Sequence, residues 1–363
     1  MEATLMLWIR TGVLLLATGA FVALPQGGVN FGLTGEEPSL AYLDDLSLPP
    51  PTGPFQPPHK QGSQLCHLMQ LKGVQKRLCR RDHQLAKVLY EAAILSTNEC
   101  KYQFRGERWN CALGVYRSNI LRKGYRETAF LYAMSAAGLV HTLSRACSTH
   151  QLERCSCAPS VRGRKDAWLW GGCDDNIQFG LRFTKRFFQA KALNKDLKAN
   201  IDRHNSRVGL KVVKNGLHKT CKCHGVSGSC TTQTCWHTLS EFEEIGKILK
   251  MKYRNAVRYP PGGSHNNAGE QQLSLRKRRR LGPRKRDLLF LEDSINFCDS
   301  SDFSPGTKGR ECNSKRKCEE ICCGRGHNLK VRMVRKPCNC TFTWCCHATC
   351  NECMVKKEMY TCK

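Results

Sequence analysis

The spacing of apolar residues predicts helices in the first half of the chain. Five of them recur at three- and four-residue intervals ahead of a cysteine: Leu85, Val88, Leu89, Ala92 and Leu95. That interval places them on one face of an amphipathic helix. Residues 129–140 are apolar on every side, which is typical of a central helix surrounded by neighbours.

A third helix is predicted from an apolar pattern further along the chain. Its members are Phe179, Phe183, Phe187, Ala190, Leu193, Leu197 and Ile201. At helical spacing the aromatic residues are better explained by core packing than by a ligand-binding box. Residues 210–235 then change character: Val212, Val213 and a glycine-rich turn between close cysteines predict a β-hairpin, with Trp236 just after it.

Two polar segments interrupt these patterns. Residues 24–62 are rich in proline and poor in aliphatic residues, which favours a flexible arm. Residues 256–292 contain Pro260-Pro-Gly-Gly263 and two basic runs, so we expect an interdomain linker that buries no core. The division predicts a helical domain at 63–255 and a small domain at 293–363.

The first 23 residues have the features of a signal peptide. Arg10 precedes the apolar run 12–17, and small residues stand at Ala20 and Ala23, where a peptidase can cut. The alternative is a membrane anchor, but the run is much shorter than the ~20 residues that span a bilayer. The sequence therefore predicts a secreted protein.

Cysteine usage agrees with export. The 363-residue chain has 24 cysteines: 12 lie between Cys66 and Cys235, 12 between Cys298 and Cys362, and none in the 62 residues between. In an oxidising compartment they are expected to pair, giving up to 12 bridges in two separately cross-linked domains. Zinc binding at 221–224 or 350–353 is the less favoured alternative. The expected fold class is disulfide-rich α+β.

The formal net charge of +28 predicts polyanionic partners. For an exported protein these are sulfated glycans or anionic membranes, not nucleic acid. The candidate glycan-binding residues are Arg276, Lys277, Arg278, Arg279, Arg280, Arg284, Lys285 and Arg286. The alternatives are cleavage by a furin-like protease, or a solvated loop without a specific role.

One segment carries the most specific signal, Cys221-Lys-Cys-His-Gly-Val-Ser-Gly-Ser-Cys230 followed by Cys235. If Cys223 pairs with Cys230 and Cys221 with Cys235, two bridges clamp one hairpin and Ser227 lies at a rigid, exposed tip. Flanking glycines leave its hydroxyl accessible to a modifying enzyme.

A hydrolase interpretation of this serine fails on sequence. The nucleophile elbow G-x-S-x-G needs glycine two residues after the serine, where Ser229 stands. His224 has no evident route to the Ser227 hydroxyl across a pinned turn, and no adjacent carboxylate orients it. We therefore expect no catalysis, no catalytic residue, no metal and no cofactor.

A second informative segment runs from Cys338 to Cys350. Period-two alternation places Phe342 and Trp344 on one face, where exposure would mark a binding tip; the alternative is that Trp344 fills a miniature core. Asn339 begins the sequon Asn-Cys-Thr, so an N-glycan is expected at the base of this hairpin, unless a disulfide at Cys340 hinders the transferase.

From about residue 65 to the end, the chain resembles the Wnt family of secreted signalling proteins. Besides the 221–236 motif, the resemblance rests on Gln103-Phe-Arg, Arg108-Trp-Asn-Cys111, Glu127-Thr-Ala-Phe130, Trp170-Gly-Gly-Cys173, Asp175-Asn176 and Tyr360-Thr-Cys362. It implies a helical domain with a lipidated hairpin, the thumb, and a cysteine-rich domain with a second hairpin, the index finger.

The resemblance also implies roles for residues of both hairpins. Ser227 would carry a palmitoleate added by the acyltransferase Porcupine, with Ser229 unmodified, and a buried acyl chain can dominate affinity. The two hairpins would hold the cysteine-rich domain of a Frizzled receptor through the residues Val226, Ser227, Gly228, Phe342, Trp344, Cys345, Cys346 and His347. A vicinal Cys345–Cys346 disulfide is implied, and exposure becomes the favoured interpretation of Trp344.

Further partners follow from the same resemblance. They are the carrier Wntless, heparan sulfate proteoglycans of the extracellular matrix, and a low-density-lipoprotein-receptor-related co-receptor. The chain departs from the common pattern at Asp174, usually serine, at His347-Ala348 and in the basic insert 276–286. The leading alternatives are a heparin-binding growth factor without lipid and a secreted serine hydrolase.

Overall fold

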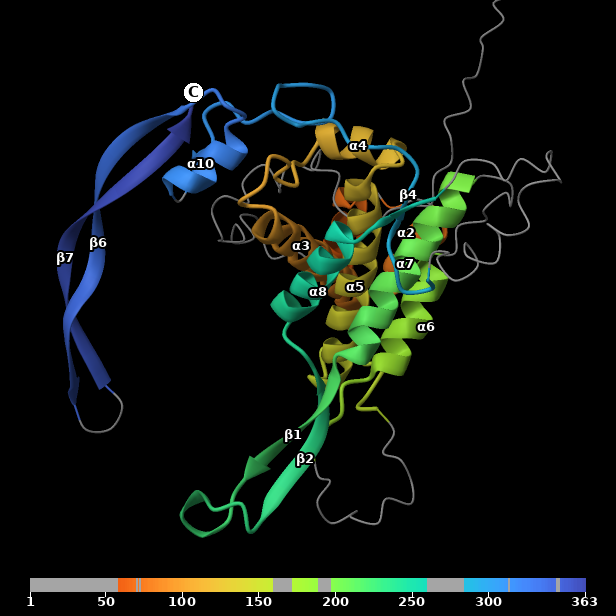
Figure 1. The fold of residues 1–363 in the computed structure, drawn as a ribbon. Coiled ribbons are helices and arrows are strands. Elements are labelled where there is room, and N and C mark those ends of the chain that lie inside the picture. The colour runs from red at the N-terminus through yellow and green to blue at the C-terminus, as the bar shows by residue number, and fades with distance from the viewer. Residues whose placement is uncertain are drawn as a thin grey trace, which may run out of the picture.

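The computed structural model describes residues 58–69, 71, 73–158, 172–188, 197–259, 284–312, 314–343 and 347–363. The predicted signal peptide, most of the predicted arm and the basic run 276–280 lie outside these ranges. Within the described part, helices build the N-terminal half and strands dominate the C-terminal end (Figure 1). None of the described helices is both long and apolar enough to cross a membrane.

The N-terminal half is organised around one central helix. This helix, α5 (Arg126–Ser148), has 19 of its 23 residues buried, as its all-round apolar sequence predicts. The surrounding helices are α1 (Pro58–Leu68), α2 (Gly73–Cys79), α3 (His83–Gln103), α4 (Val115–Arg122), α6 (Ile177–Phe187), α7 (Leu197–Asn215) and α8 (Phe242–Arg254).

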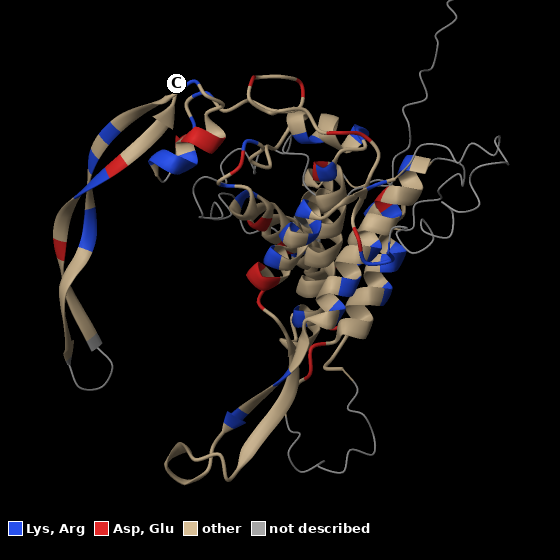
Figure 2. Ribbon diagram, in the orientation of Figure 1, with Lys and Arg blue, Asp and Glu red and all other residues tan. Residues whose placement is uncertain are grey.

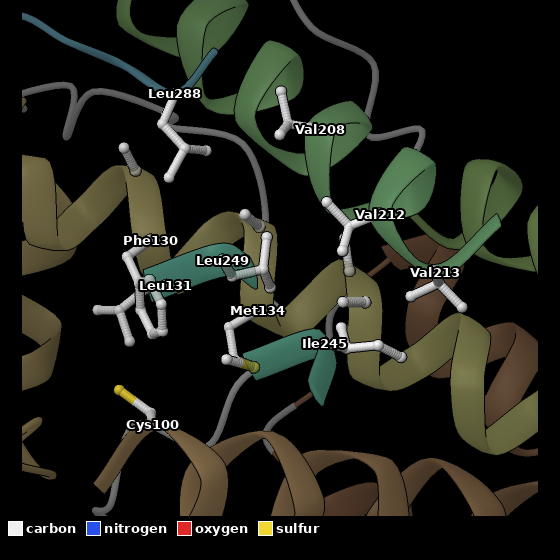
Figure 3. Close-up of a cluster of buried hydrophobic side chains, with 14 of the residues drawn as sticks. Cys100, Phe130, Leu131, Met134, Val208, Val212, Val213, Ile245, Leu249 and Leu288 are labelled. Carbon is white, nitrogen blue, oxygen red and sulfur yellow. The ribbon is translucent and has the colours of Figure 1, made fainter. Parts of the chain in front are cut away.

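Small residues let α3 and α7 approach α5 closely. A side chain at Gly138 of α5 would overlap the Ser96 hydroxyl of α3, and one at Gly209 of α7 would overlap the Ala133 carbonyl of α5. Figure 3 shows the resulting core, in which side chains of α5, α7 and α8 meet above Cys100 of α3. Asp82 begins α3 by accepting the N–H groups of Gln84 and Leu85.

Two sequence predictions for this region need correction. The single helix predicted over 179–201 is two helices, α6 and α7, with residues 189–196 outside the described part. Val212 and Val213 belong to α7 and not to the hairpin, because both are buried against the helical core, and packing overrides their β-branched preference. The phenylalanine rings of α6 do pack in the core, as predicted.

The described ends of the predicted arm and linker are also folded. Helix α1 begins at Pro58, inside the predicted arm, where the fixed φ of proline suits a first turn. Strands β3 (Val257–Arg258) and β4 (Leu289–Phe290) pair in parallel, and residues 288–290 are buried. The expectation that the linker buries no core was wrong here, since Leu-Leu-Phe supplies enough apolar surface to dock on the helices.

The C-terminal part consists of one short helix and three strands. Helix α10 (Lys315–Ile321) and strand β5 (Glu311–Cys312) pack at the root of a long antiparallel ribbon formed by β6 (His327–Thr343) and β7 (His347–Cys362). The small core here contains four cysteines and Ile321. Disulfides therefore replace much of the apolar area that so short a segment lacks.

Eleven disulfides join the described cysteines. Six use all twelve cysteines of the N-terminal half: Cys66–Cys79, Cys100–Cys111, Cys147–Cys155, Cys157–Cys173, Cys221–Cys235 and Cys223–Cys230. Five lie in the C-terminal half: Cys298–Cys323, Cys312–Cys318, Cys322–Cys362, Cys338–Cys353 and Cys340–Cys350. Cys345 and Cys346 lie outside the described residues. Among the described cysteines, every bridge stays within its own half.

Polar and apolar contacts hold the two halves together. The Arg310 guanidinium donates to the carbonyls of Glu107 at 2.7 Å and Arg108 at 2.5 Å, and it is more than half buried, which lowers its pKa. Nearby, the Phe297 ring lies 6.4 Å from that of Trp109. A cavity of 490 Å³ opens between the halves beside these contacts.

Candidate functional site

The hairpin predicted around Ser227 is an antiparallel pair that projects from the helical domain (Figure 1). Its strands are β1 (Leu217–Cys223) and β2 (Gln233–Leu239). Cys221 and Cys235 are directly opposite partners in the ladder and are bridged, and a second bridge joins Cys223 to Cys230 beyond it. These are the two pairs that the sequence predicts.

The tip between the strands is fixed by its own hydrogen bonds. The His224 N–H donates to the Thr232 carbonyl at 2.9 Å, and the Gly225 N–H donates to the Ser229 carbonyl at 2.9 Å. A side chain at Gly225 would overlap Thr231 and Ser229, so this position requires glycine. The loop therefore has a defined shape.

Ser227 lies at the apex of this loop. It belongs to a short 3-10 turn, Val226–Gly228, and has φ 56° and ψ 27°, a left-handed conformation that serine rarely adopts. The residue is exposed, and its hydroxyl has no hydrogen-bond partner among the described residues. Val226 beside it is 88% exposed. The apex thus presents a free hydroxyl and an apolar side chain.

The arrangement does not supply a base for this hydroxyl. The His224 ring is engaged elsewhere, because its Nε2 lies 2.9 Å from the Thr234 hydroxyl on the opposite strand. Ser229 exchanges a hydrogen bond with Thr231 at 2.9 Å, so the second serine of the motif is already paired. The geometry suits Ser227 to modification by another enzyme.

The base of the hairpin is held by two aspartates, to which the sequence analysis assigned no structural role. Asp175 accepts the Leu239 N–H at 2.8 Å and the Ser148 hydroxyl at 2.5 Å, and so joins β2 to the end of α5. Asp174 accepts the His237 N–H at 2.7 Å. The sequence places Asp175 in a family motif and shows Asp174 as a departure from it, but periodicity cannot reveal that both bind the base of the hairpin.

The second hairpin carries the predicted aromatic tip. Phe342, which pairs with Ala348 one step before the end of the ladder, is 82% exposed. His347 begins β7 opposite Thr343. Trp344, Cys345 and Cys346 lie outside the described residues, so their predicted roles stay predictions.

Asn339 lies in an irregular step of the β6–β7 ladder, between Cys338 and Thr341. It is exposed and has a left-handed φ of 48°. Its neighbour Cys340 is bridged to Cys350. The sequon is nearer the tip of the long ribbon than its base, contrary to the expectation, because the ribbon begins at His327 instead of Cys338.

Three of the predicted glycan-binding residues are described. Arg284, Lys285 and Arg286 are exposed. The Lys285 carbonyl accepts a bond from Lys211, and the Arg286 carbonyl one from Lys252, each at 2.9 Å. The backbone is thereby fixed to the helices while the three cationic side chains remain in solvent.

Buried ionisable groups lie where the halves meet. Burial raises the pKa of Glu127, whose carboxylate accepts the Tyr253 hydroxyl at 2.7 Å and the Ser294 hydroxyl at 2.5 Å. Burial lowers the pKa of Lys250 to about 8, although the Glu107 carboxylate 2.6 Å away opposes this. The pair Glu127–Ser294 links α5 to the segment that leads into the C-terminal half.

Comparison with known proteins now places the fold. The family model described as the wnt family matches residues 67–363. The chain belongs to the Wnt family. It is 47% identical over 347 residues to protein Wnt-9a of Gallus gallus, covering 92% of this chain and 94% of that protein. It is 45% identical over 361 residues to protein Wnt-9b of Homo sapiens, covering 96% and 98%.

A solved structure shows the same Wnt fold. The chain is similar to one in the structure described as human WLS in complex with WNT8A, with a TM-score of 0.56, 35% identity, and coverage of 77% of this chain and 95% of that one. The helical N-terminal domain and small β-rich C-terminal region are thus those of a Wnt signalling ligand.

Proposed function

We propose that this Wnt protein is a secreted morphogen that carries a palmitoleate on Ser227 and binds Frizzled receptors with both hairpins. The observation that carries the proposal is the Ser227 hydroxyl, exposed and unpaired within the described residues at the apex of a doubly bridged hairpin. The acyltransferase Porcupine would add the acyl chain. The acyl chain and the exposed Val226 would then enter an apolar groove of the receptor, where each buried methylene contributes ~0.8 kcal/mol.

The finger would make the second contact with the receptor cysteine-rich domain. Phe342 is exposed at its end, which suits an anchor that inserts into a pocket on a partner. In this proposal Trp344, the Cys345–Cys346 disulfide and His347 complete the contact. Both hairpins extend in the same direction from the body of the molecule in Figure 1, so one receptor domain can contact both.

The remaining partners follow from the same proposal. Export would use Wntless, a role supported by the WLS complex of the similar structure. Outside the cell the chain would bind heparan sulfate proteoglycans through residues 276–286 and recruit a low-density-lipoprotein-receptor-related co-receptor. The protein would act by binding, without catalysis or a cofactor, and Asn339 would carry an N-glycan.

Mass spectrometry of the secreted protein tests the central step. The peptide spanning Cys221 to Cys235 is compared between cells with and without a Porcupine inhibitor. We expect a C16:1 acyl mass on Ser227 that the inhibitor removes. Ser227→Ala should lose the acyl mass and receptor activity, whereas Ser229→Ala, the matched control, should keep both. Receptor-active protein with an unmodified Ser227 would contradict the proposal.

A further inference from the structure

The two faces of the finger ribbon differ in chemistry. Directly opposite residues of an antiparallel pair point to the same side, and successive residues alternate sides. On one side lie the exposed apolar residues Leu329, Val331, Met333 and Met354, interspersed with Arg335 and Lys356; this side is here called the apolar face. On the other side lie Lys330, Arg332, Lys336 and Lys357, here called the cationic face, with Val334, Val355 and Met359 between them. Both faces turn with the twist of the ribbon (Figure 1).

The acidic residues of the ribbon lie on only one of these faces, together with the cations Arg335 and Lys356. Glu352 and Glu358 are the acidic residues of β6 and β7, and the register places both on the side of the apolar face. There Glu352 lies 3.6 Å from Arg335, and Glu358 accepts the Tyr360 hydroxyl at 2.7 Å. The cationic face contains four positive charges and no acidic residue. Figure 2 shows the basic and acidic bands along the ribbon.

The four cations of the cationic face are unbalanced within the protein. All four side chains are exposed, and none has an ion pair or hydrogen bond to another described residue. Arg332 and Lys357 are direct cross-strand partners. Like charges opposite each other destabilise a pair of strands, so this arrangement has a cost that an external anion would offset.

We propose that the cationic face binds a sulfated polysaccharide along the length of the finger. From Lys330 to Lys336 the row is about 20 Å long and only two strands wide, which fits a linear polyanion. An anionic bilayer fits less well, since its headgroups form a plane and its interior rewards apolar side chains beside the cations. Here the exposed Val355 lies beside the cations, whereas Leu329, Val331, Met333 and Met354 are exposed on the opposite side of the ribbon.

The site differs from residues 276–286 and from the acylated hairpin. Binding at this site depends on the proposed export of the chain, because sulfated polysaccharides occur outside the cell. It does not depend on acylation of Ser227. A polysaccharide on the cationic face would leave the finger tip at Phe342 and the apolar face uncovered. The glycan would thus hold the ligand without covering its proposed receptor contacts.

Binding of the full-length chain to immobilised heparin tests the site. The variant combines Lys330→Gln, Arg332→Gln, Lys336→Gln and Lys357→Gln. Its matched control loses the same charge from exposed cations of α6 and α7, through Arg182→Gln, Lys185→Gln, Arg186→Gln and Lys214→Gln. At physiological salt we expect the finger variant to raise the heparin Kd about tenfold and the control to change it less than about twofold.

Further variants and ligands in the same binding experiment distinguish between classes of partner. A variant that keeps the charges, with Lys330→Arg, Arg332→Lys, Lys336→Arg and Lys357→Arg, should bind heparin as the wild type does. Equal losses in the finger variant and its control would show diffuse attraction and overturn the proposal. The proposal would also be overturned if the finger variant bound heparin normally but no longer bound phosphatidylserine vesicles or polyglutamate. Unchanged far-UV circular dichroism verifies folding, and Ser227 acylation, measured separately, tests the proposed function.

Discussion

The carboxylate of Asp174 contacts both the backbone and the side chain of His237. One oxygen accepts the His237 N–H at 2.7 Å, and the other lies 3.1 Å from the Nδ1 of the imidazole ring. Asp174 follows Cys173, which is bridged to Cys157, whereas His237 belongs to β2. The contact therefore fixes the base of the thumb to the helical domain.

Replacing Asp174 should loosen the thumb at its base. In Asp174→Ala the His237 N–H loses its acceptor, and we expect a local cost of about 1–3 kcal/mol. Hydrogen exchange of the β2 amides near His237 should accelerate while amides of α5 stay protected. Asp174→Asn, which retains one acceptor oxygen, should show a smaller change. Equal protection in Asp174→Ala and the wild type would refute the role of this contact.

Removing the outer bridge of the thumb should impair receptor activation without unfolding the helical domain. The pair Cys223→Ser and Cys230→Ser releases a short loop, at a cost of about 2–3 kcal/mol in the chain-entropy model. We expect less acyl on Ser227 and weaker Frizzled binding, with normal helical circular dichroism. The matched control, Cys312→Ser with Cys318→Ser, opens a loop of similar length and should preserve acylation.

The stability of the domain interface should depend on pH through Glu127. Burial raises its pKa above the unfolded value, so the folded state binds more protons, and stability falls as pH rises through the folded pKa. Glu127→Gln should remove this fall while one amide oxygen still accepts a hydrogen bond. Thermal unfolding of the two proteins across pH 4–8 measures the difference. A parallel decline in both would assign the effect to other groups.

Arg310→Ala should free the C-terminal domain from the helical domain. The guanidinium donates to two carbonyls of the loop after α3, and charged hydrogen bonds each contribute about 1.5–3 kcal/mol. We expect faster proteolysis between residues 291 and 311 and a larger radius of gyration by small-angle scattering. Lys336→Ala, which removes an exposed cation far from this contact, should change neither quantity. Unaltered scattering for Arg310→Ala would show that other contacts suffice.

Local pattern sufficed for much of the fold. The buried face of α3, the all-round burial of α5 and the two bridges of the thumb follow from spacing, because neighbours along the chain determine them. The long finger ribbon could not be predicted in this way. Its alternation of cations and apolar residues resembles a solvated segment until the pairing register of β6 and β7 is known. The roles of Asp174 and Arg310 depend on contacts far apart in sequence, which no local pattern encodes.

The closed set of six bridges in the N-terminal half has a consequence for biosynthesis. All twelve of its cysteines find partners among themselves, and 62 residues separate Cys235 from Cys298. The helical domain and its thumb can thus complete their oxidation while the finger is still being translated, since domains generally fold in the order of synthesis. An acyltransferase in the same compartment would then meet a finished thumb on an unfinished chain.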